Sequence, residues 1–161
     1  MTEWTCGTVG LQPVRPEEAK EVSEMAHPIF WEVYAQNPKE RVEWFLNTYQ
    51  SPESIREQIL SGTVYAFVIL EGERIGYLAY EKDSGGMRLS KLYLLKEYRG
   101  RGIGGHLLGY VEDRAREAGA SCVHLEVNQY RTRSQEFYKS HGYVPDERMD
   151  DYRIIMRKRL V

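Results

Sequence analysis

A glycine-rich segment between a predicted strand and a predicted helix constrains the fold of this chain more than any other feature. Four glycines lie within residues 100–105, and Arg99 and Arg101 flank the first of them. A long strand is predicted over Met87–Leu95, which follows the turn residues Asp83-Ser84-Gly85-Gly86. Because the amides of a glycine turn can approach an anion closely and a helix N-terminus attracts negative charge, phosphate is the expected ligand. The helix is predicted from five apolar residues that share one face: Ile103, Leu107, Leu108, Val111 and Ala115.

The other predicted elements change in kind at Gly62. Before it, Pro16, Asn37-Pro38 and Ser51-Pro52 are starting signals for helices, and a short strand is predicted over Thr8–Val14. After it come strands joined by tight turns, then a strand, a helix and a final hairpin. These later elements are Val64–Leu70, Ile75–Tyr80, Met87–Leu95, Cys122–Val127, a helix through Phe137, and the strands Tyr143-Val144 and Tyr152–Arg157.

This order predicts one domain over residues 1–161 with an α/β (α+β) fold. We expect a mixed, mostly antiparallel sheet of about seven strands, with four or five helices on its two faces. Along Cys122–Val127, the side chains of Val123, Leu125 and Val127 are expected on the core face, and Glu126 on the opposite face.

Composition excludes several classes of protein. Hydrophobic residues make up 42% and charged residues 29%, which is typical of a globular domain, and the net charge of −2 lacks the basic excess of a nucleic-acid binder. Cys6 and Cys122 form no CxxC or Cys/His pattern, so neither a disulfide framework nor a metal site is expected. Met1–Gly10 has no apolar core of a signal peptide, and no apolar run could span a membrane. A cytoplasmic location is expected.

Two nucleotide-binding motifs compete for the glycine segment. A P-loop would need Lys and Ser/Thr where His106 and Leu107 stand. A dinucleotide-binding turn fits GxGxxG through Gly100, Gly102 and Gly105. However, four polar residues separate the strand from Gly100, the earlier strands are linked as hairpins, and too little chain follows Glu126 for further βα units. A purely structural turn is a third alternative, although four glycines would be unfavourable in backbone entropy for that role alone.

A second motif distinguishes these alternatives. Arg99, Gly102 and Gly104 fill the pattern R/Q-x-x-G-x-G/A, and the later segment Leu125–Tyr143 reads LEVNQYRTRSQEFYKSHGY. Together the two motifs resemble the GNAT superfamily of N-acetyltransferases over Val64 to Val161. In the later motif, the matching residues are Asn128, Tyr138, Gly142 and Tyr143. Two residues depart from it, since the family usually has Asn where this chain has Arg131 and Ala where it has Ser134.

The resemblance implies acetyl-CoA as co-substrate and no metal. The backbone amides of Leu92, Tyr93 and Leu94 would hold the pantetheine arm and the oxyanion. Asn128, Arg131 and Tyr138 would lie beside the cofactor, with an arginine able to pair with phosphate where the family has Asn. The pyrophosphate would be bound by the turn itself: Arg99, Gly100, Arg101, Gly102, Ile103 and Gly104.

The resemblance also implies two catalytic residues. A primary ammonium of pKa ~10 must lose a proton before it can attack a thioester, and the leaving thiolate must gain one. Tyr138 is the expected general acid. Glu126, at the end of the strand that borders the cofactor, is the expected general base, acting directly or through water.

The acceptor is expected to be a primary amine of a small molecule. Carboxylates and aromatic rings together suit a cation, and the string Met149–Tyr152 resembles a subgroup with polyamine-acetylating members. Acetylation of a protein N-terminus or lysine, and a non-catalytic acyl-CoA sensor, remain alternatives. No nucleic-acid or membrane partner is expected, and a homodimer through the C-terminal strands is left open. The expected acceptor-lining residues are Trp31, Tyr34, Glu81, Asp150 and Tyr152.

Overall fold

The predicted change from helical to extended structure after Gly62 is present in the computed structural model, which describes residues 4–6 and 9–160. Three helices precede Gly62: α1 (Ala19–Val33), α2 (Lys39–Tyr49) and α3 (Pro52–Leu60). Ser51 is the N-cap of α3, because its side chain accepts the amide of Ser54 at 3.2 Å, as the sequence predicts. The short elements of this part are β1 (Trp4–Cys6), β2 (Val9–Pro13) and the 3-10 turn η1 (Pro16–Glu18).

The strands alternate with two further helices after this point. Among the described residues there are five α-helices and eight strands. The strands form one sheet in which neighbours follow the order β1-β2-β3-β4-β5-β6-β8-β7. β5 and β6 are parallel, whereas β1/β2, β2/β3, β6/β8 and β7/β8 are antiparallel, so the mixed sheet is confirmed. β1 is a strand that the sequence did not predict, and the Thr8 end of the predicted first strand lies outside the described residues. The later elements are β3 (Val64–Leu70), β4 (Glu73–Asp83), β5 (Gly86–Leu94), the 3-10 turn η2 (Lys96–Tyr98), α4 (Ile103–Glu117), β6 (Cys122–Asn128), α5 (Thr132–Ser140), β7 (Val144–Arg148) and β8 (Arg153–Arg159).

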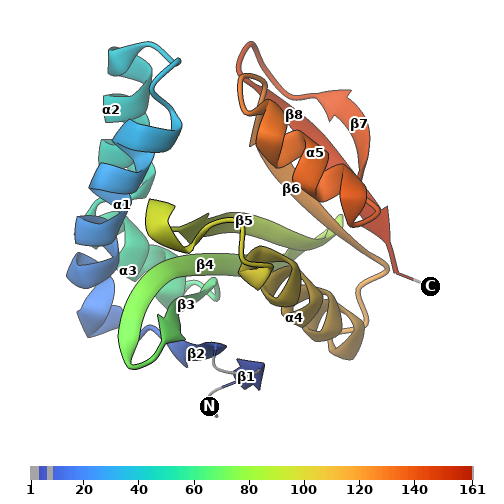
Figure 1. The fold of residues 1–161 in the computed structure, drawn as a ribbon, viewed down its shortest axis with the longest axis horizontal. Coiled ribbons are helices and arrows are strands. Elements are labelled where there is room, and N and C mark those ends of the chain that lie inside the picture. The colour runs from blue at the N-terminus through green and yellow to red at the C-terminus, as the bar shows by residue number, and fades with distance from the viewer. Residues whose placement is uncertain (1–3, 7–8, 161) are drawn as a thin grey trace. The chain divides into compact units, whose positions relative to one another are not determined.

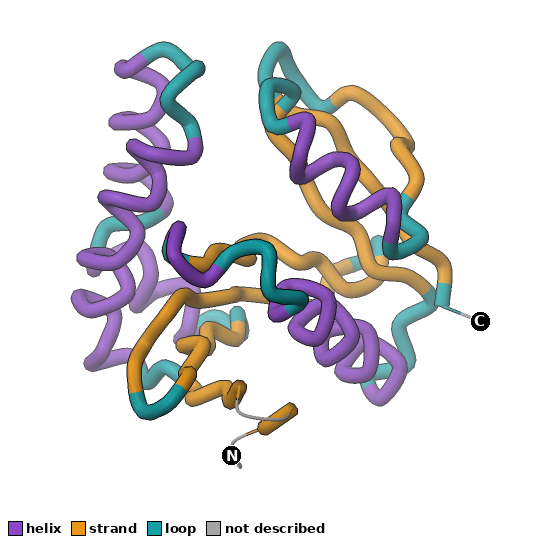
Figure 2. The backbone as a smooth tube through the Cα atoms, in the orientation of Figure 1, coloured by secondary structure: helices purple, strands orange, loops and turns teal. Residues whose placement is uncertain are grey.

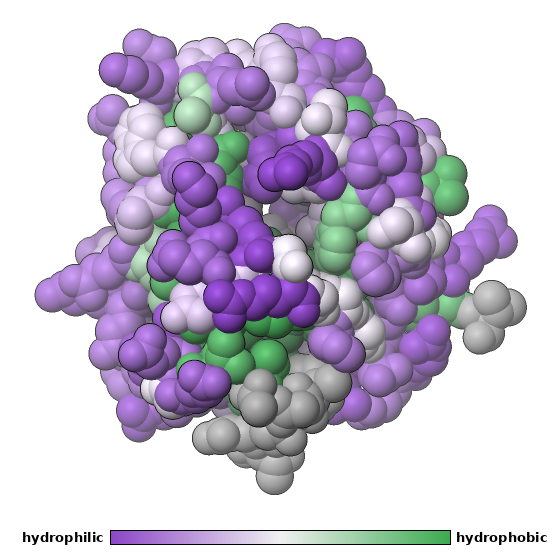
Figure 3. Space-filling view, in the orientation of Figure 1, coloured by the Kyte–Doolittle hydropathy of each residue, from purple (hydrophilic) through white to green (hydrophobic). Residues whose placement is uncertain are grey.

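The chain forms two compact units that share the β4–β5 hairpin. The first contains the described residues up to Ala79 together with Lys91–Ile103, and the second contains Tyr80–Ser90 and the described residues from Gly104 onward. In the first unit, α1, α2 and α3 lie beside one another (Figure 1). The face of the molecule shown in Figure 3 is mostly hydrophilic, with smaller hydrophobic areas.

The first unit has a core that combines apolar packing with one buried polar cluster. Val22, Phe30 and Phe67 are almost completely buried. Gln50 is also fully buried. Its side-chain oxygen accepts the hydroxyl of Tyr77 at 2.6 Å, and its side-chain nitrogen donates to the carbonyl of Tyr49 and the hydroxyl of Tyr65. Both polar atoms of the Gln50 side chain therefore have partners, which makes their burial tolerable.

The second unit packs the predicted core face of β6 inward. Val123, Leu125 and Val127 are buried, and the apolar stripe of α4 is buried with them. Charged and polar residues alternate with them along the strand, so the opposite face of β6 is polar, as predicted. This polar face carries Glu126.

Candidate active site

The glycine turn between β5 and α4 has a backbone that only glycine adopts readily. Gly100 and Gly102 have φ angles of 76° and 80°, both in the left-handed region. Both residues are exposed, and a Cβ added to either one would meet nothing within 4 Å. The space above these two backbone positions is therefore open to a ligand. Figure 2 shows the turn as the loop that enters α4.

Gly104 and Gly105, the other two glycines of the segment, allow close packing of α4 against the α5 region. A Cβ on Gly104 would lie 3.1 Å from Cζ of Phe137, and one on Gly105 would lie 3.0 Å from Cε1 of His141. Both partners belong to the α5 region, so these glycines let the first turn of α4 pack closely against it. This division of roles was missed at the level of the sequence. The spacing of Phe137 and His141, one helical turn apart, is the signal that could have revealed it.

The two arginines of the turn also differ. Arg99 donates to both carboxylate oxygens of Glu32 on α1, at 2.7 and 3.0 Å, and its Nε donates to the carbonyl of Leu94 at 3.0 Å. Its guanidinium therefore fixes the start of the turn within the first unit. Arg101 is exposed, and its guanidinium lies over the ring of Tyr98, 5.2 Å from the ring centroid.

The predicted pantetheine-binding residues Leu92, Tyr93 and Leu94 form the end of β5 and are half-buried. The hydroxyl of Tyr93 lies 2.5 Å from that of Tyr34, which is an expected acceptor-lining residue. The ring of Phe30 packs against both tyrosines, with centroid distances of 5.1 Å to Tyr93 and 5.2 Å to Tyr34. This cluster joins the end of α1 to the end of β5. Trp31, the other expected acceptor residue in this unit, is 40% exposed.

The loop between β6 and α5 is organised by the backbone and side chain of Asn128. Its Oδ1 accepts the amide of Tyr130 at 2.9 Å, and its carbonyl accepts the amide of Arg131 at 3.0 Å. Arg131 is the N-cap residue of α5. Asn128, the last residue of β6, is therefore hydrogen-bonded to Arg131 at the start of α5.

Tyr138 lies near the end of α5 and is half-buried. Its ring contacts Phe137 and Tyr143 edge to face, with centroid distances of 5.1 and 5.8 Å. Its carbonyl accepts the amides of His141 and Tyr143, each at 3.0 Å. The backbone and ring of Tyr138 are thus fixed from several sides.

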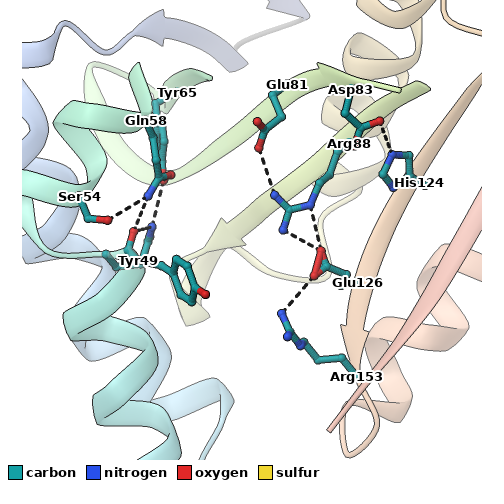
Figure 4. Close-up of polar contacts among 11 residues, drawn as sticks. Tyr49, Ser54, Gln58, Tyr65, Glu81, Asp83, Arg88, His124, Glu126 and Arg153 are labelled. Carbon is teal, nitrogen blue, oxygen red and sulfur yellow. Dashed lines mark hydrogen bonds and ion pairs between the residues drawn. The ribbon is translucent and has the colours of Figure 1, made fainter. Parts of the chain in front are cut away.

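Glu126 is the centre of a charged network in the second unit (Figure 4). Its Oε2 accepts Nε and Nη2 of Arg88, at 2.9 and 2.7 Å. Its Oε1 accepts Nη1 of Arg153 at 3.1 Å. The side chain of Glu126 is only 13% exposed, so these contacts are largely shielded from water.

Two expected acceptor residues lie at the ends of this network. Arg88 also donates to Glu81 at 3.1 Å, and Arg153 also donates twice to Oδ2 of Asp150, at 3.0 and 2.8 Å. The structure thus brings Glu81, Glu126 and Asp150 together through two arginines that the sequence did not single out. Alternation along the strands places charged residues on polar positions, but it does not say which charges meet.

The network shifts the ionisation of its members. Partial desolvation lowers the pKa of the Arg88 guanidinium, but Glu126 and then Glu81 more than offset this and raise it. Desolvation raises the pKa of the Asp150 carboxyl, whereas the amides of Tyr152 and Arg153 and the guanidinium of Arg153 together lower it more strongly. The net pKa of Asp150 is therefore lowered, and these two groups stay charged at neutral pH. Tyr152, the remaining expected acceptor residue, is half-buried.

Metal-binding clusters and membrane-spanning helices are both absent from residues 4–6 and 9–160. No group of three His, Cys, Asp or Glu side chains in this part of the chain is arranged to hold a metal ion. Likewise, none of its helices is long and apolar enough to cross a bilayer.

Comparison with known proteins identifies relatives over most of the chain. A family model described as an acetyltransferase (GNAT) domain matches residues 33–151. An uncharacterised N-acetyltransferase of Lactobacillus delbrueckii subsp. lactis is 25% identical over 142 residues, which is 78% of this chain and 81% of the relative. The aminoalkylphosphonate N-acetyltransferase of Salmonella typhimurium is 38% identical over 55 residues, which is 34% of this chain and 36% of the relative.

Solved structures share the fold. The crystal structure of the PaiA N-acetyltransferase of Thermoplasma acidophilum, in complex with coenzyme A, has a TM-score of 0.84 at 21% identity. The similarity covers 94% of this chain and 99% of that one. An acetyltransferase of Thermus thermophilus has a TM-score of 0.71 at 19% identity, over 95% of this chain and 97% of that one.

Proposed function

Because the chain belongs to the GNAT family of acetyl-CoA-dependent N-acetyltransferases, we propose that its acceptor is a primary amine of a small cationic molecule. The observation that carries this proposal is the charged network around Glu126. Its three carboxylates and two guanidiniums leave one net negative charge at the polar face of β6. A negative site attracts an ammonium ion.

The donor side of the proposal rests on the glycine turn. The exposed turn has open space over Gly100 and Gly102, so the residues present fit a pyrophosphate. Arg101, which is exposed next to Gly102, would supply a positive charge to it. Acetyl-CoA supplies an acyl group that is activated as a thioester.

The chain's own residues would carry the proton transfers. Glu126 would take a proton from the ammonium, directly or through one water, so that the nitrogen gains a lone pair for attack. Backbone amides at Leu92–Leu94 would stabilise negative charge on the carbonyl oxygen. As the carbon–sulfur bond breaks, Tyr138 would donate its phenolic proton to the leaving sulfur, and the second proton lost by the new amide nitrogen would restore the phenol.

The number of positive charges on the acceptor is a further part of the proposal. The network carries one net negative charge. This charge balances the single positive charge of an acceptor whose only ammonium is the reacting group, so no further acidic side chain is needed. A polyamine would need additional carboxylates or rings for its second charge.

An amine screen with acetyl-CoA, followed by thiol release, tests the proposal. The panel should contain monoamines, di- and polyamines, aminoalkylphosphonates and a lysine-containing peptide. We expect turnover with one of the small amines. Turnover of the peptide alone would show a protein acetyltransferase instead. Tight acetyl-CoA binding without turnover of any amine would show a non-catalytic sensor.

A further inference from the structure

We propose that Arg88 and Arg153 are positioning residues that orient the Glu126 carboxylate and leave it one position for the reacting amine or its bridging water. This inference rests on the proposed function, and in particular on Glu126 as the general base. It assigns a role to two residues outside both motifs of the sequence.

The first argument is the number of hydrogen bonds that the carboxylate can accept. An ionised carboxylate has about four acceptor positions on its two oxygens. Arg88 occupies both positions of Oε2, and Arg153 occupies one position of Oε1. One acceptor position therefore remains on Oε1. Because it belongs to one defined oxygen, the direction from which a donor can approach is also defined.

The second argument is the register of the sheet. In the β5/β6 pair, Arg88 is opposite His124, two residues before Glu126. In the β6/β8 pair, Arg153 is opposite Asn128, two residues after Glu126. The two arginines therefore approach Glu126 along diagonals from the two neighbouring strands, which is a distance that long side chains can span. Neither oxygen can rotate away without breaking a contact on one side.

The third argument is that each arginine is itself held. Glu81 on β4 accepts from Arg88, and Asp150, just before β8, accepts from Arg153. Asp150 is fixed in turn by the amides of Tyr152 and Arg153, at 2.8 Å each. The row Glu81–Arg88–Glu126–Arg153–Asp150 thus ends in a backbone turn on one side (Figure 4 labels all but Asp150). Such support from a second layer of residues is what holds a reacting group in productive geometry.

A purely structural ladder of ion pairs is the competing explanation, and a double-mutant cycle separates the two. The variants are Arg88→Met, Glu126→Gln and the double variant, and the readout is kcat with saturating amine and acetyl-CoA. We expect Glu126→Gln to lower kcat by roughly 10²-fold, as for loss of a general base. If Arg88 acts through Glu126, Arg88→Met should lower kcat by about tenfold in the wild-type background and have no effect in the Glu126→Gln background.

Two further variants sharpen the cycle. Arg88→Lys keeps the charge but cannot donate two hydrogen bonds from a planar fork, so kcat should recover only in part. Arg157→Met is the matched control, because Arg157 lies on β8 with 32% exposure, close to the 31% of Arg88, and pairs with Asp146 instead of Glu126. This control should leave kcat and the KM for acetyl-CoA unchanged.

Several outcomes would overturn the inference. Multiplicative losses in the double variant, or an unchanged kcat in Arg88→Met, would show that Arg88 does not act through Glu126. Acetyl-CoA binding and thermal unfolding are measured for each variant, and if Arg88→Met does not fold, the cycle is run with Arg88→Lys. A wild-type enzyme without turnover of any amine would refute the proposed function, whereas an active enzyme with a multiplicative cycle would refute this inference alone.

Discussion

At the scale of single residues, glycine has two separate purposes within one short segment. Gly100 and Gly102 supply backbone angles that other residues adopt only with strain, and they do so at the exposed surface of the turn. Gly104 and Gly105 instead remove side chains where α5 residues approach α4. A pattern of glycines in a sequence cannot distinguish these purposes, because the second depends on contacts with a segment more than thirty residues away in the chain.

Gly102→Val tests the first purpose. Valine at a φ angle of 80° is strained by roughly 1–2 kcal/mol, and its side chain would cover the adjacent amides. We expect acetyl-CoA binding, measured by calorimetry, to weaken by about tenfold or more. Gly109→Ala is the control, since a Cβ there meets nothing within 4 Å and alanine favours a helix. Unchanged binding in Gly102→Val would refute the pyrophosphate turn.

Asp150 is a residue whose ionisation contributes to stability in a defined pH range. Its folded pKa lies below the unfolded value of about 3.8, so the ionised carboxylate stabilises the fold above that value, and this contribution is lost as the pH falls through the folded pKa. Asp150→Asn should therefore lower the free energy of unfolding by about 1 kcal/mol at pH 7. In urea unfolding, the difference from wild type should shrink as the pH falls below about 3.8. A difference that stays constant with pH would contradict this role.

At the scale of elements, one buried carboxylate connects α4 to the C-terminal strands. Glu112 on α4 is 7% exposed, accepts the hydroxyl of Tyr143 at 2.9 Å and pairs with Lys158 on β8 at 3.0 Å. Desolvation, followed by the charge of Glu112, raises the pKa of Tyr143 well above its usual value, so its hydroxyl stays protonated and donates. The cluster holds Tyr143 in place. Tyr143 follows α5, the helix that contains Tyr138.

Tyr143→Phe tests this cluster. The change leaves Glu112 with one donor fewer in a buried site, so we expect the free energy of unfolding to fall by about 1–3 kcal/mol. Tyr130→Phe is the control, because Tyr130 is 46% exposed. Loss of its hydroxyl should change the free energy of unfolding by less than about 0.5 kcal/mol. Equal unfolding midpoints for the two variants in urea would show that the Tyr143 hydroxyl contributes nothing.

At the scale of the whole molecule, the sequence predicts the order of elements well and their long-range contacts poorly. Proline and serine signals locate the starts of α2 and α3, and alternation locates β6, because these are local effects. The pairing of Arg88 with Glu126 depends on the register between β5 and β6, which a long connection joins. Similarly, Arg99 pairs with Glu32, 67 residues earlier. The residues that neighbour Arg99 in the sequence therefore do not indicate which carboxylate it contacts.

The same limit applies to the catalytic assignment. The two motifs place Tyr138 and Glu126 on predicted elements, and the structure contains those elements as α5 and β6. The chemistry of these two residues is a prediction that follows from the family. It also determines what a decisive measurement must observe, namely the proton donated to sulfur separately from the binding of acetyl-CoA.

The most direct test compares wild type with Tyr138→Phe, using an amine from the screen and acetyl-CoA. We expect one thiol released for each acetylated amine detected by mass spectrometry in the wild type. In Tyr138→Phe, turnover should fall by roughly 10²-fold while the Kd for acetyl-CoA stays unchanged. Acetyl-CoA binding without amine-dependent thiol release in the wild type would contradict acetyl transfer, and full turnover in Tyr138→Phe would contradict Tyr138 as the acid.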